Sequence, residues 1–113
     1  IIIGGDVHAN YVCDVKADFA DPASRTVATE FCGTSITSPA GFSQFAVEAV
    51  LRDNPHILLA DVRYRGYIVV ELDERRCEAR LRRIDDPASP SPSVSTLARF
   101  AVEDGIPGAR RLD

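Results

Sequence analysis

Polar and apolar residues alternate most regularly over residues 66–84, where the pattern predicts a β-hairpin. The apolar positions are Ile68, Val70 and Leu72 before a four-residue loop, and Cys77, Ala79 and Leu81 after it. A hairpin whose loop is 73–76 sets Leu72 opposite Cys77, Val70 opposite Ala79 and Ile68 opposite Leu81. One face is then apolar, because alternate side chains of a strand point to opposite faces. On the other face Glu71 opposes Glu78, a like-charge pair that neighbouring arginines offset.

A longer period predicts one helix. Apolar residues fall at i, i+3, i+4, i+7 and i+8 in the set Phe42, Phe45, Ala46, Ala49 and Val50. Ser38 followed by Pro39 offers a cap and a first-turn proline, and Pro55 excludes helix from the residue before it. We interpret the aromatic stripe as core packing.

Other segments are predicted to be strands from their content of apolar and β-branched residues: 1–3, 11–16, 27–32, 56–62 and 98–102. The run Ile1-Ile2-Ile3 is typical of a fully buried strand. Strands 11–16 and 27–32 are expected to pair antiparallel across a turn-rich segment. The proline- and serine-rich segment 86–93 predicts an extended linker, and 109–113 a frayed tail. The fold class expected is α+β, rich in β-strand, with one helix.

Candidate chemistry follows the first strand. Gly4-Gly5 lets the backbone turn, and Asp6 and His8 come next, two residues apart. In an extended segment those two side chains point to one side. Carboxylate and imidazole donors together suit a catalytic metal ion. The alternative is a surface turn in which Asp6 caps backbone amides and His8 is solvated.

Other polar residues are candidates for a pocket. Asn10 flanks the Asp-x-His segment, and Thr34 and Ser35 begin a hydroxyl-rich loop that either lines a phosphate pocket or bonds its own backbone. Residues 63–67 either present arginines to an anionic substrate or form a solvated turn. We interpret His56, which follows a proline, as structural.

Composition narrows the class of protein. The net charge of -4 argues against a general nucleic-acid binder. No apolar stretch approaches the length of a membrane-spanning helix.

The absence of methionine and the start inside a strand suggest a piece of a longer polypeptide. Cys13 and Cys32 could form a disulfide if their strands pair, or remain buried free thiols, and no cysteine spacing fits a zinc site.

Three motifs in order carry a family resemblance: Gly-Asp-Val-His at 5–8, Thr-Glu-Phe-Cys-Gly-Thr-Ser at 29–35, and Arg-Gly-Tyr at 65–67. They resemble the C-terminal part of the metallophosphatase domain of the PhoD-like alkaline phosphatase and phosphodiesterase family. The resemblance runs from Ile1 to about Gly108. It implies that 1–113 is the C-terminal portion of a metallophosphoesterase-type α/β sandwich, with layered sheets and flanking helices. Tyr11 departs from the tryptophan common in the family.

The resemblance also implies a function. Asp6 and His8 would complete a dinuclear metal site, of iron and calcium by family, with zinc or manganese compatible, in an exported enzyme that hydrolyses phosphate esters. The remaining ligands would come from the N-terminal remainder of the polypeptide, so the isolated chain should be inactive. The alternatives are a non-catalytic β-rich module that binds a ligand or protein, and a catalytically inactive remnant.

Overall fold

Two four-stranded sheets and one helix make up the chain, which the computed structural model describes from residue 1 to residue 113. In chain order the elements are β1 (Ile2–Gly4), β2 (Asn10–Lys16), β3 (Thr26–Cys32), α1 (Gln44–Leu51), β4 (Ile57–Asp61), β5 (Arg65–Leu72), β6 (Arg76–Ile84), β7 (Val94–Glu103) and β8 (Ile106–Arg111). The first sheet has the order β1-β3-β2-β4 and the second β5-β6-β7-β8. The expected β-rich fold with one helix is confirmed.

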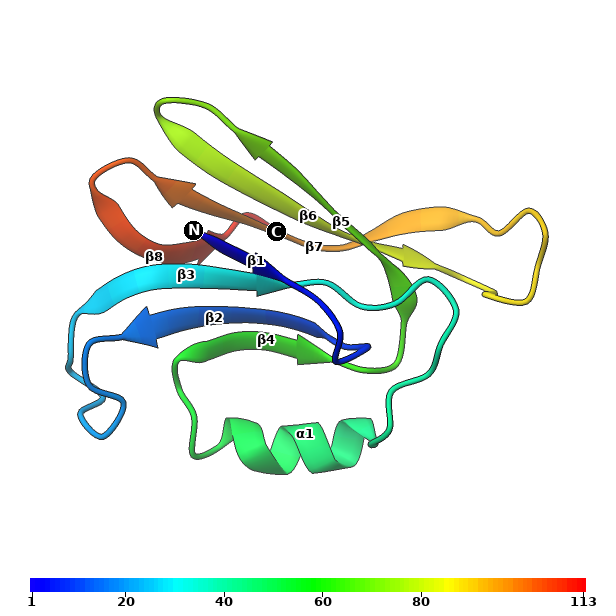
Figure 1. Cartoon of the computed structure of the whole chain (residues 1–113), viewed down its shortest axis with the longest axis horizontal. Helices are drawn as coiled ribbons and strands as arrows, with labels where there is room; N and C mark the ends of the chain where they lie inside the picture. The colour runs from blue at the N-terminus through cyan, green and yellow to red at the C-terminus, as the bar shows by residue number, and fades with distance from the viewer.

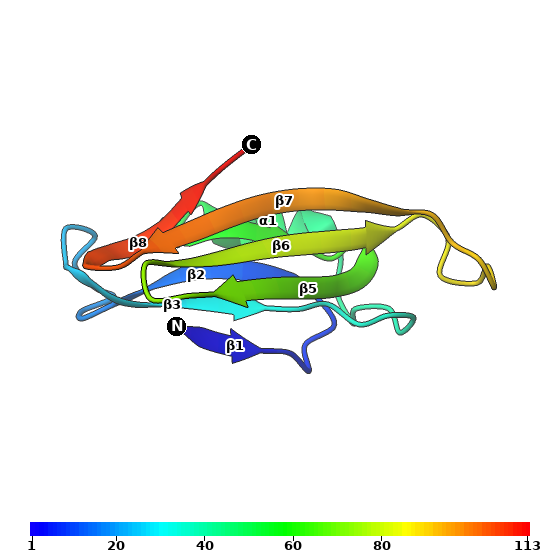
Figure 2. The same ribbon diagram turned by 90° about the horizontal axis from the view of Figure 1, so that it is seen from above.

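The core lies between the two sheets, which Figure 1 shows as separate layers with α1 outside the first, whereas Figure 2 views the stack from above with the second sheet over the first. The side chains buried between the sheets are Val12 and Phe31 from the first sheet and Cys77, Ala79, Leu81, Ala98 and Phe100 from the second. A smaller cluster packs α1 on the opposite face of the first sheet, through Val47 against Ala9, Ala60 and Val62. The molecule is therefore a sandwich with one helical layer.

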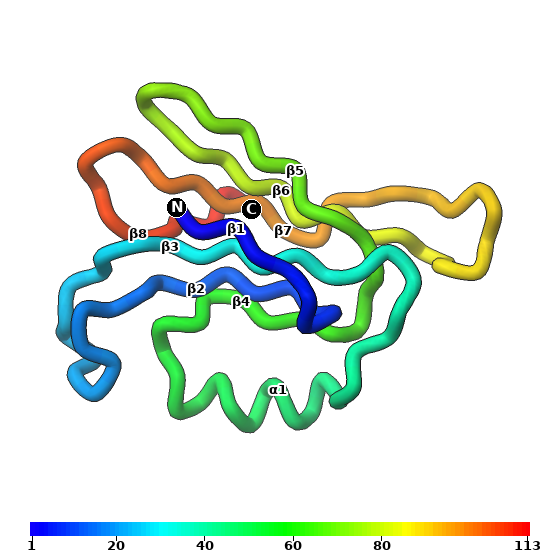
Figure 3. Tube along the Cα trace, viewed as in Figure 1, coloured from blue at the N-terminus to red at the C-terminus, as the bar shows by residue number.

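Strand β1 lies at the edge of the first sheet, parallel to β3, with Ile2 opposite Glu30. Figure 3 traces it beside β3. The expectation of a fully buried strand is wrong for this chain, because Ile1, Ile2 and Ile3 are 50%, 46% and 63% exposed. The apolar run correctly indicates a strand, but β1 has one neighbouring strand and its side chains are only about half covered.

Pairing of the next two strands agrees with the sequence. β2 and β3 are antiparallel, with Val12 opposite Phe31, and β4 pairs antiparallel with β2 on its other side. Alternation then sends Val12 into the core between the sheets and Tyr11 towards the helix.

The hairpin of β5 and β6 has the predicted register, with Leu72 opposite Cys77, Val70 opposite Ala79 and Ile68 opposite Leu81. Glu71 lies opposite Glu78, as expected. Each glutamate has an arginine partner: Arg80 donates to Glu71 at 2.6 Å and Arg76 to Glu78 at 2.9 Å. The like-charge pair is thereby offset by its diagonal neighbours.

The helix begins later than expected. Its N-cap is Ser43, whose hydroxyl accepts a hydrogen bond from the Ala46 amide at 3.3 Å. The prediction that Ser38 caps the helix and Pro39 lies in its first turn is therefore wrong. Phe45 is 80% exposed, and Val47 is the buried residue of the helix. The aromatic stripe is therefore not core packing. The helix also lacks the length and apolar character that crossing a membrane requires.

The last third of the chain differs from the prediction in two places, the loop 86–93 and the strand β8, which the sequence did not predict. β6 and β7 pair antiparallel, and the segment 86–93 is the loop between them, closed by the Asp85 amide donating to the Ser93 carbonyl at 3.1 Å. Figure 1 shows this loop projecting from the sandwich rather than crossing its surface. The prediction of a frayed tail over 109–113 is wrong, because β8 pairs with β7 and places Phe100 opposite Arg111.

Gly66, near the start of β5, generates a stability prediction. A Cβ atom at this position would lie 1.9 Å from the backbone oxygen of Arg82 on β6. The backbone of one strand must then shift, so Gly66→Ala should lower the free energy of unfolding by about 3 kcal/mol or more. Gly41→Ala is the matched control, because a Cβ atom added at Gly41 would have nothing within 4 Å of it. Denaturant titration followed by circular dichroism measures both; equal stabilities would contradict the close approach.

Candidate functional site

The loop between β1 and β2 carries Asp6 and His8 in an unusual backbone conformation. Their φ angles are 75° and 54°, in the left-handed region that residues other than glycine rarely adopt. The expected extended segment is therefore wrong here, and the strand geometry that would place residues i and i+2 on one side does not apply. Such strained positions cost about 1–3 kcal/mol each and cluster at functional sites.

The side chains of this loop differ in what they contact. Asp6 is exposed, and its carboxylate has no hydrogen-bond or ion-pair partner in the chain. His8 is half-buried, and its Nδ1 lies 3.1 Å from the carbonyl oxygen of Pro39. A carbonyl can only accept, so we assign the ring proton to Nδ1. In the neutral ring the lone pair of His8 is then on Nε2, as in metal-binding histidines whose other nitrogen donates to a backbone carbonyl.

The donors of this loop fit part of a metal centre. Asp6 offers a carboxylate oxygen, and His8 offers Nε2 while its Nδ1 is engaged by Pro39; both are donor types that metal ions bind. No group of three or more His, Cys, Asp or Glu side chains in the chain is arranged to hold a metal ion. A complete site therefore requires ligands from outside these residues.

Asn10 joins this loop to the one after β3. Its side chain is fully buried, and its Oδ1 accepts a hydrogen bond from the Thr34 amide at 3.3 Å. Its Nδ2 is buried with no partner. Buried amide donors without a partner are uncommon in folded proteins, so this nitrogen is a donor that the rest of the chain leaves unsatisfied.

The hydroxyls of Thr34 and Ser35 make contacts within the protein. Thr34 donates to the carbonyl oxygen of Tyr64 at 3.3 Å, and Ser35 donates to that of Ser38. Each hydroxyl retains acceptor capacity, and Ser35 uses it for Arg65. In this arrangement the two hydroxyls fix the path of the loop.

Arg65 is the residue at this site to which the sequence assigned no role of its own. It begins β5 with 6% exposure, and its Nη1 donates to the carbonyl oxygens of His8 at 2.8 Å and Ser38 at 2.7 Å. Its Nη2 donates to the carbonyl oxygen of Val62 at 2.7 Å. Burial lowers the pKa of the guanidinium. The expectation of a solvated turn is wrong for this residue, and nothing in the sequence signalled its role, because most of its partners are backbone carbonyls.

Arg63, two residues earlier, behaves differently. Its side chain is exposed, and its Nε donates to the buried carboxylate of Asp61 at 2.6 Å. This hydrogen bond raises the pKa of Arg63. Asp61 also accepts from the Arg63 and Tyr64 amides, so it closes the turn between β4 and β5. Arg63 and Asp61 thus stabilise the turn that places Arg65.

The cysteines are free thiols, in agreement with one of the two alternatives drawn from the sequence. Cys32 is buried under the Gly4-Gly5 turn, with its Sγ 3.6 Å from the carbonyl oxygen of Gly5. Burial, with the negative charge of Glu30, raises the pKa of Cys32 and that of Cys13, the latter to about 11. Both thiols are therefore protonated at neutral pH in the metal-free chain.

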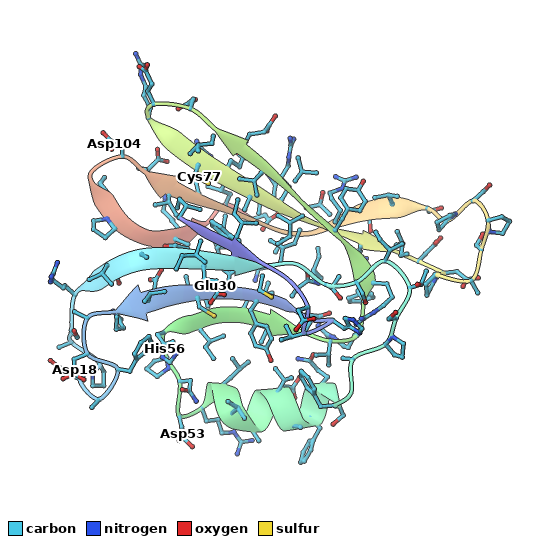
Figure 4. The ribbon with its side chains drawn as sticks, viewed as in Figure 1. Asp18, Glu30, Asp53, His56, Cys77 and Asp104 are labelled. Carbon is cyan, nitrogen blue, oxygen red and sulfur yellow. The ribbon has the colours of Figure 1, made fainter.

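His56 and Glu30, which Figure 4 labels, have different surroundings. His56 precedes β4 and packs edge-on against the ring of Phe19, with centroids 4.9 Å apart. This contact agrees with the structural interpretation of His56. Glu30 lies on β3 opposite Cys13, in the middle of the sheet.

Comparison with known proteins identifies the family. The family model of the PhoD-like phosphatases matches residues 1–81. The chain belongs to this family. It is 30% identical over 114 residues to alkaline phosphatase D of Bacillus subtilis (strain 168), covering 99% of this chain and 19% of that protein. A solved structure of PhoD superposes with a TM-score of 0.87 at 30% identity, covering 98% of this chain and 22% of that one. The chain thus spans about a fifth of the length of these relatives.

The raised pKa of Cys13 gives a measurable pH dependence. The thiol should stay protonated and resist iodoacetamide until the pH approaches about 11, because alkylation requires the thiolate. Peptide mapping by mass spectrometry measures this at each pH, and the denatured protein, with a midpoint of about 8.5, is the control. Because the folded-state pKa is raised, its contribution to stability is lost as pH rises from the unfolded value towards 11. Rapid alkylation of folded Cys13 at pH 8 would contradict the assignment.

Proposed function

We propose that this chain is the C-terminal part of a metal-dependent phosphoesterase, and that Asp6 and His8 are two of its metal ligands. The observation that carries the proposal is the pair of left-handed residues in one loop, one with a free carboxylate and the other with Nδ1 held by Pro39. Membership of the PhoD-like phosphatase family supports a phosphate ester as the substrate. The net charge of -4 gives no support for nucleic acid as a binding partner.

The residues of the chain contribute defined parts of such a site. His8 presents Nε2 because its other nitrogen is engaged with Pro39, and Asp6 presents an unpaired carboxylate. When bound, a dinuclear centre supplies Lewis acidity for a phosphoryl oxygen and a nucleophile at neutral pH. Asn10, Thr34 and Ser35 are candidates for the pocket wall. Of the three, Asn10 has the unpartnered donor, because the hydroxyl protons of Thr34 and Ser35 are engaged by the carbonyls of Tyr64 and Ser38.

The metals implied by the resemblance are iron and calcium. Carboxylate oxygens suit either ion. Imidazole nitrogen suits iron, whereas calcium takes oxygen ligands only. By this chemistry Asp6 could serve either ion, and His8 belongs with the iron. The same two donors are compatible with zinc or manganese, so elemental analysis of the longer protein is the deciding measurement.

The N-terminal remainder of the polypeptide is the proposed structural partner. Strand β1 pairs with β3 alone, and its three isoleucines are exposed. An unpaired strand edge with apolar side chains is suited to receive another strand. We propose that upstream residues cover β1 and bring the remaining metal ligands, and that the whole protein is exported, as the family resemblance implies.

Substitution of the two proposed ligands tests the function. Asp6→Asn and His8→Ala, made in the longer protein, should each reduce kcat/KM by more than the ~10–100-fold typical of residues that only support a ligand. Both should lower bound metal, and the double variant should lose little more than either single one, because ligands of one site act together. Steady-state kinetics and elemental analysis measure these effects.

Controls for this experiment come from the same chain. Asp53→Asn changes an exposed aspartate, and His56→Ala removes the histidine that packs on Phe19. Both should keep parental metal content. Full metal and normal activity in either ligand variant would make that residue a turn residue and remove the basis of the proposal.

The isolated 113 residues should not hydrolyse a chromogenic phosphate ester above background. Two ligands cannot hold two metal ions, and the chain has no group of three or more His, Cys, Asp or Glu side chains arranged to hold one. The longer protein assayed in parallel gives the positive control. A chelator-sensitive rate that co-purifies with the isolated chain through successive columns would show that residues 1–113 contain a complete site.

A further inference from the structure

The buried arginine of the site lacks a carboxylate partner. Arg65 is 6% exposed, makes no salt bridge, and donates instead to neutral oxygens. Burial of an unpaired charge is unfavourable, so a buried guanidinium persists where hydrogen bonds satisfy it. The oxygens that satisfy Arg65 come from the loop of His8, the loop of Ser35 and Ser38, and the turn at Val62.

Two of these contacts bracket the hydrogen bond that orients His8. Nη1 of Arg65 holds the carbonyl of His8 at 2.8 Å, which fixes the backbone at the left-handed residue. The same nitrogen holds the carbonyl of Ser38 at 2.7 Å, one peptide before the Pro39 carbonyl that accepts from the imidazole. One guanidinium nitrogen therefore fixes both the backbone of His8 and the loop that holds its ring.

We propose that Arg65 is a positioning residue, which holds His8 with Nδ1 directed at Pro39 and Nε2 free to bind metal. This inference rests on the proposed function of His8 and adds a residue that acts through it. Arg65 contacts neither substrate nor metal in this role. Its charge is satisfied inside the protein, and its effect is on the geometry of the ligand.

Lysine cannot substitute for this arrangement. The guanidinium presents donors from two nitrogens in a planar fork, and here the fork spans from Val62 to the His8 and Ser38 carbonyls. An ammonium keeps the charge but places its donors at one point. Arg65→Lys therefore separates the charge of the side chain from its geometry.

The test compares Arg65→Lys with Arg80→Lys in the longer protein. Arg80 lies on β6 and pairs with Glu71 on the outer face of the second sheet, so its replacement controls for an arginine-to-lysine change. Metal affinity is measured by chelator competition at a temperature where every variant is folded. We expect Arg65→Lys to bind metal about 10–100-fold more weakly, and Arg80→Lys to match the parent.

A second readout reports the ring directly. In the metal-free protein labelled with ¹⁵N-histidine, the His8 signals, assigned by their loss in His8→Ala, should show the Nδ1–H tautomer. In Arg65→Lys they should shift towards the Nε2–H tautomer that is normal in water. A purely architectural role for Arg65 would lower the melting temperature but leave the tautomer and the metal affinity of the folded protein unchanged, and that result would overturn the proposal.

A milder variant decides the matter if Arg65→Lys does not fold. Ser35→Ala removes a hydroxyl that accepts from Nη1 of Arg65 and donates to the Ser38 carbonyl, so it loosens the loop that holds the His8 ring and leaves the charge in place. We expect a loss of metal affinity of about 3–10-fold on the same reasoning, and parental affinity would overturn the proposal. If His8→Ala and Asp6→Asn also leave metal binding unchanged, the proposed function has failed; if only the Arg65 and Ser35 variants do, the positioning role alone has failed.

Discussion

The contact between the two sheets is the interaction on which the other features depend. Phe31 of β3 and Phe100 of β7 are almost fully buried in it, and burial of each such side chain contributes about 1.5–3 kcal/mol. Because Phe31 is fixed in this core, the residues that follow it emerge at one end of the sandwich. The loop that starts at Gly33 is thereby brought beside the loop of Asp6 and His8, and the backbone bond from the Gly33 amide to the Gly4 carbonyl, 3.0 Å long, joins the two.

Local patterns in the sequence are sufficient where strands pair with their immediate neighbours. The β5–β6 hairpin is predicted in the correct register because alternation on both sides of a short loop leaves one arrangement with an apolar face. β8 is missed because Pro107 and Gly108 interrupt its pattern, and its pairing depends on β7 being present. The long loop 86–93 resembles a linker for a related reason: composition describes the loop but does not tell which strands it joins.

Burial is harder to predict than secondary structure. The period of residues 42–50 indicates a helix, but the pattern does not fix which side of that helix faces the sheet. In the structure Val47 is buried and Phe45 faces solvent. Residue type and spacing are enough to name Asp6 and His8 as candidate ligands, but they do not predict the left-handed backbone conformation of these two residues. The role of Arg65 is hidden because its partners are mostly backbone carbonyls, which leave no trace in a sequence.

The placement of Arg65 answers a difficulty that any site on this loop must meet. Two strained positions, separated only by Val7, cost about 1–3 kcal/mol each, and the apolar core does not reach residues that are exposed or half-buried. The strain therefore has to be held by hydrogen bonds from the neighbouring segments. A carboxylate could not supply them, because it accepts and the groups to be held are carbonyls. A guanidinium carries enough donors to bind three segments at once, and its burial at the start of β5 makes those bonds rigid, so the second sheet sets the geometry of a loop that belongs to the first.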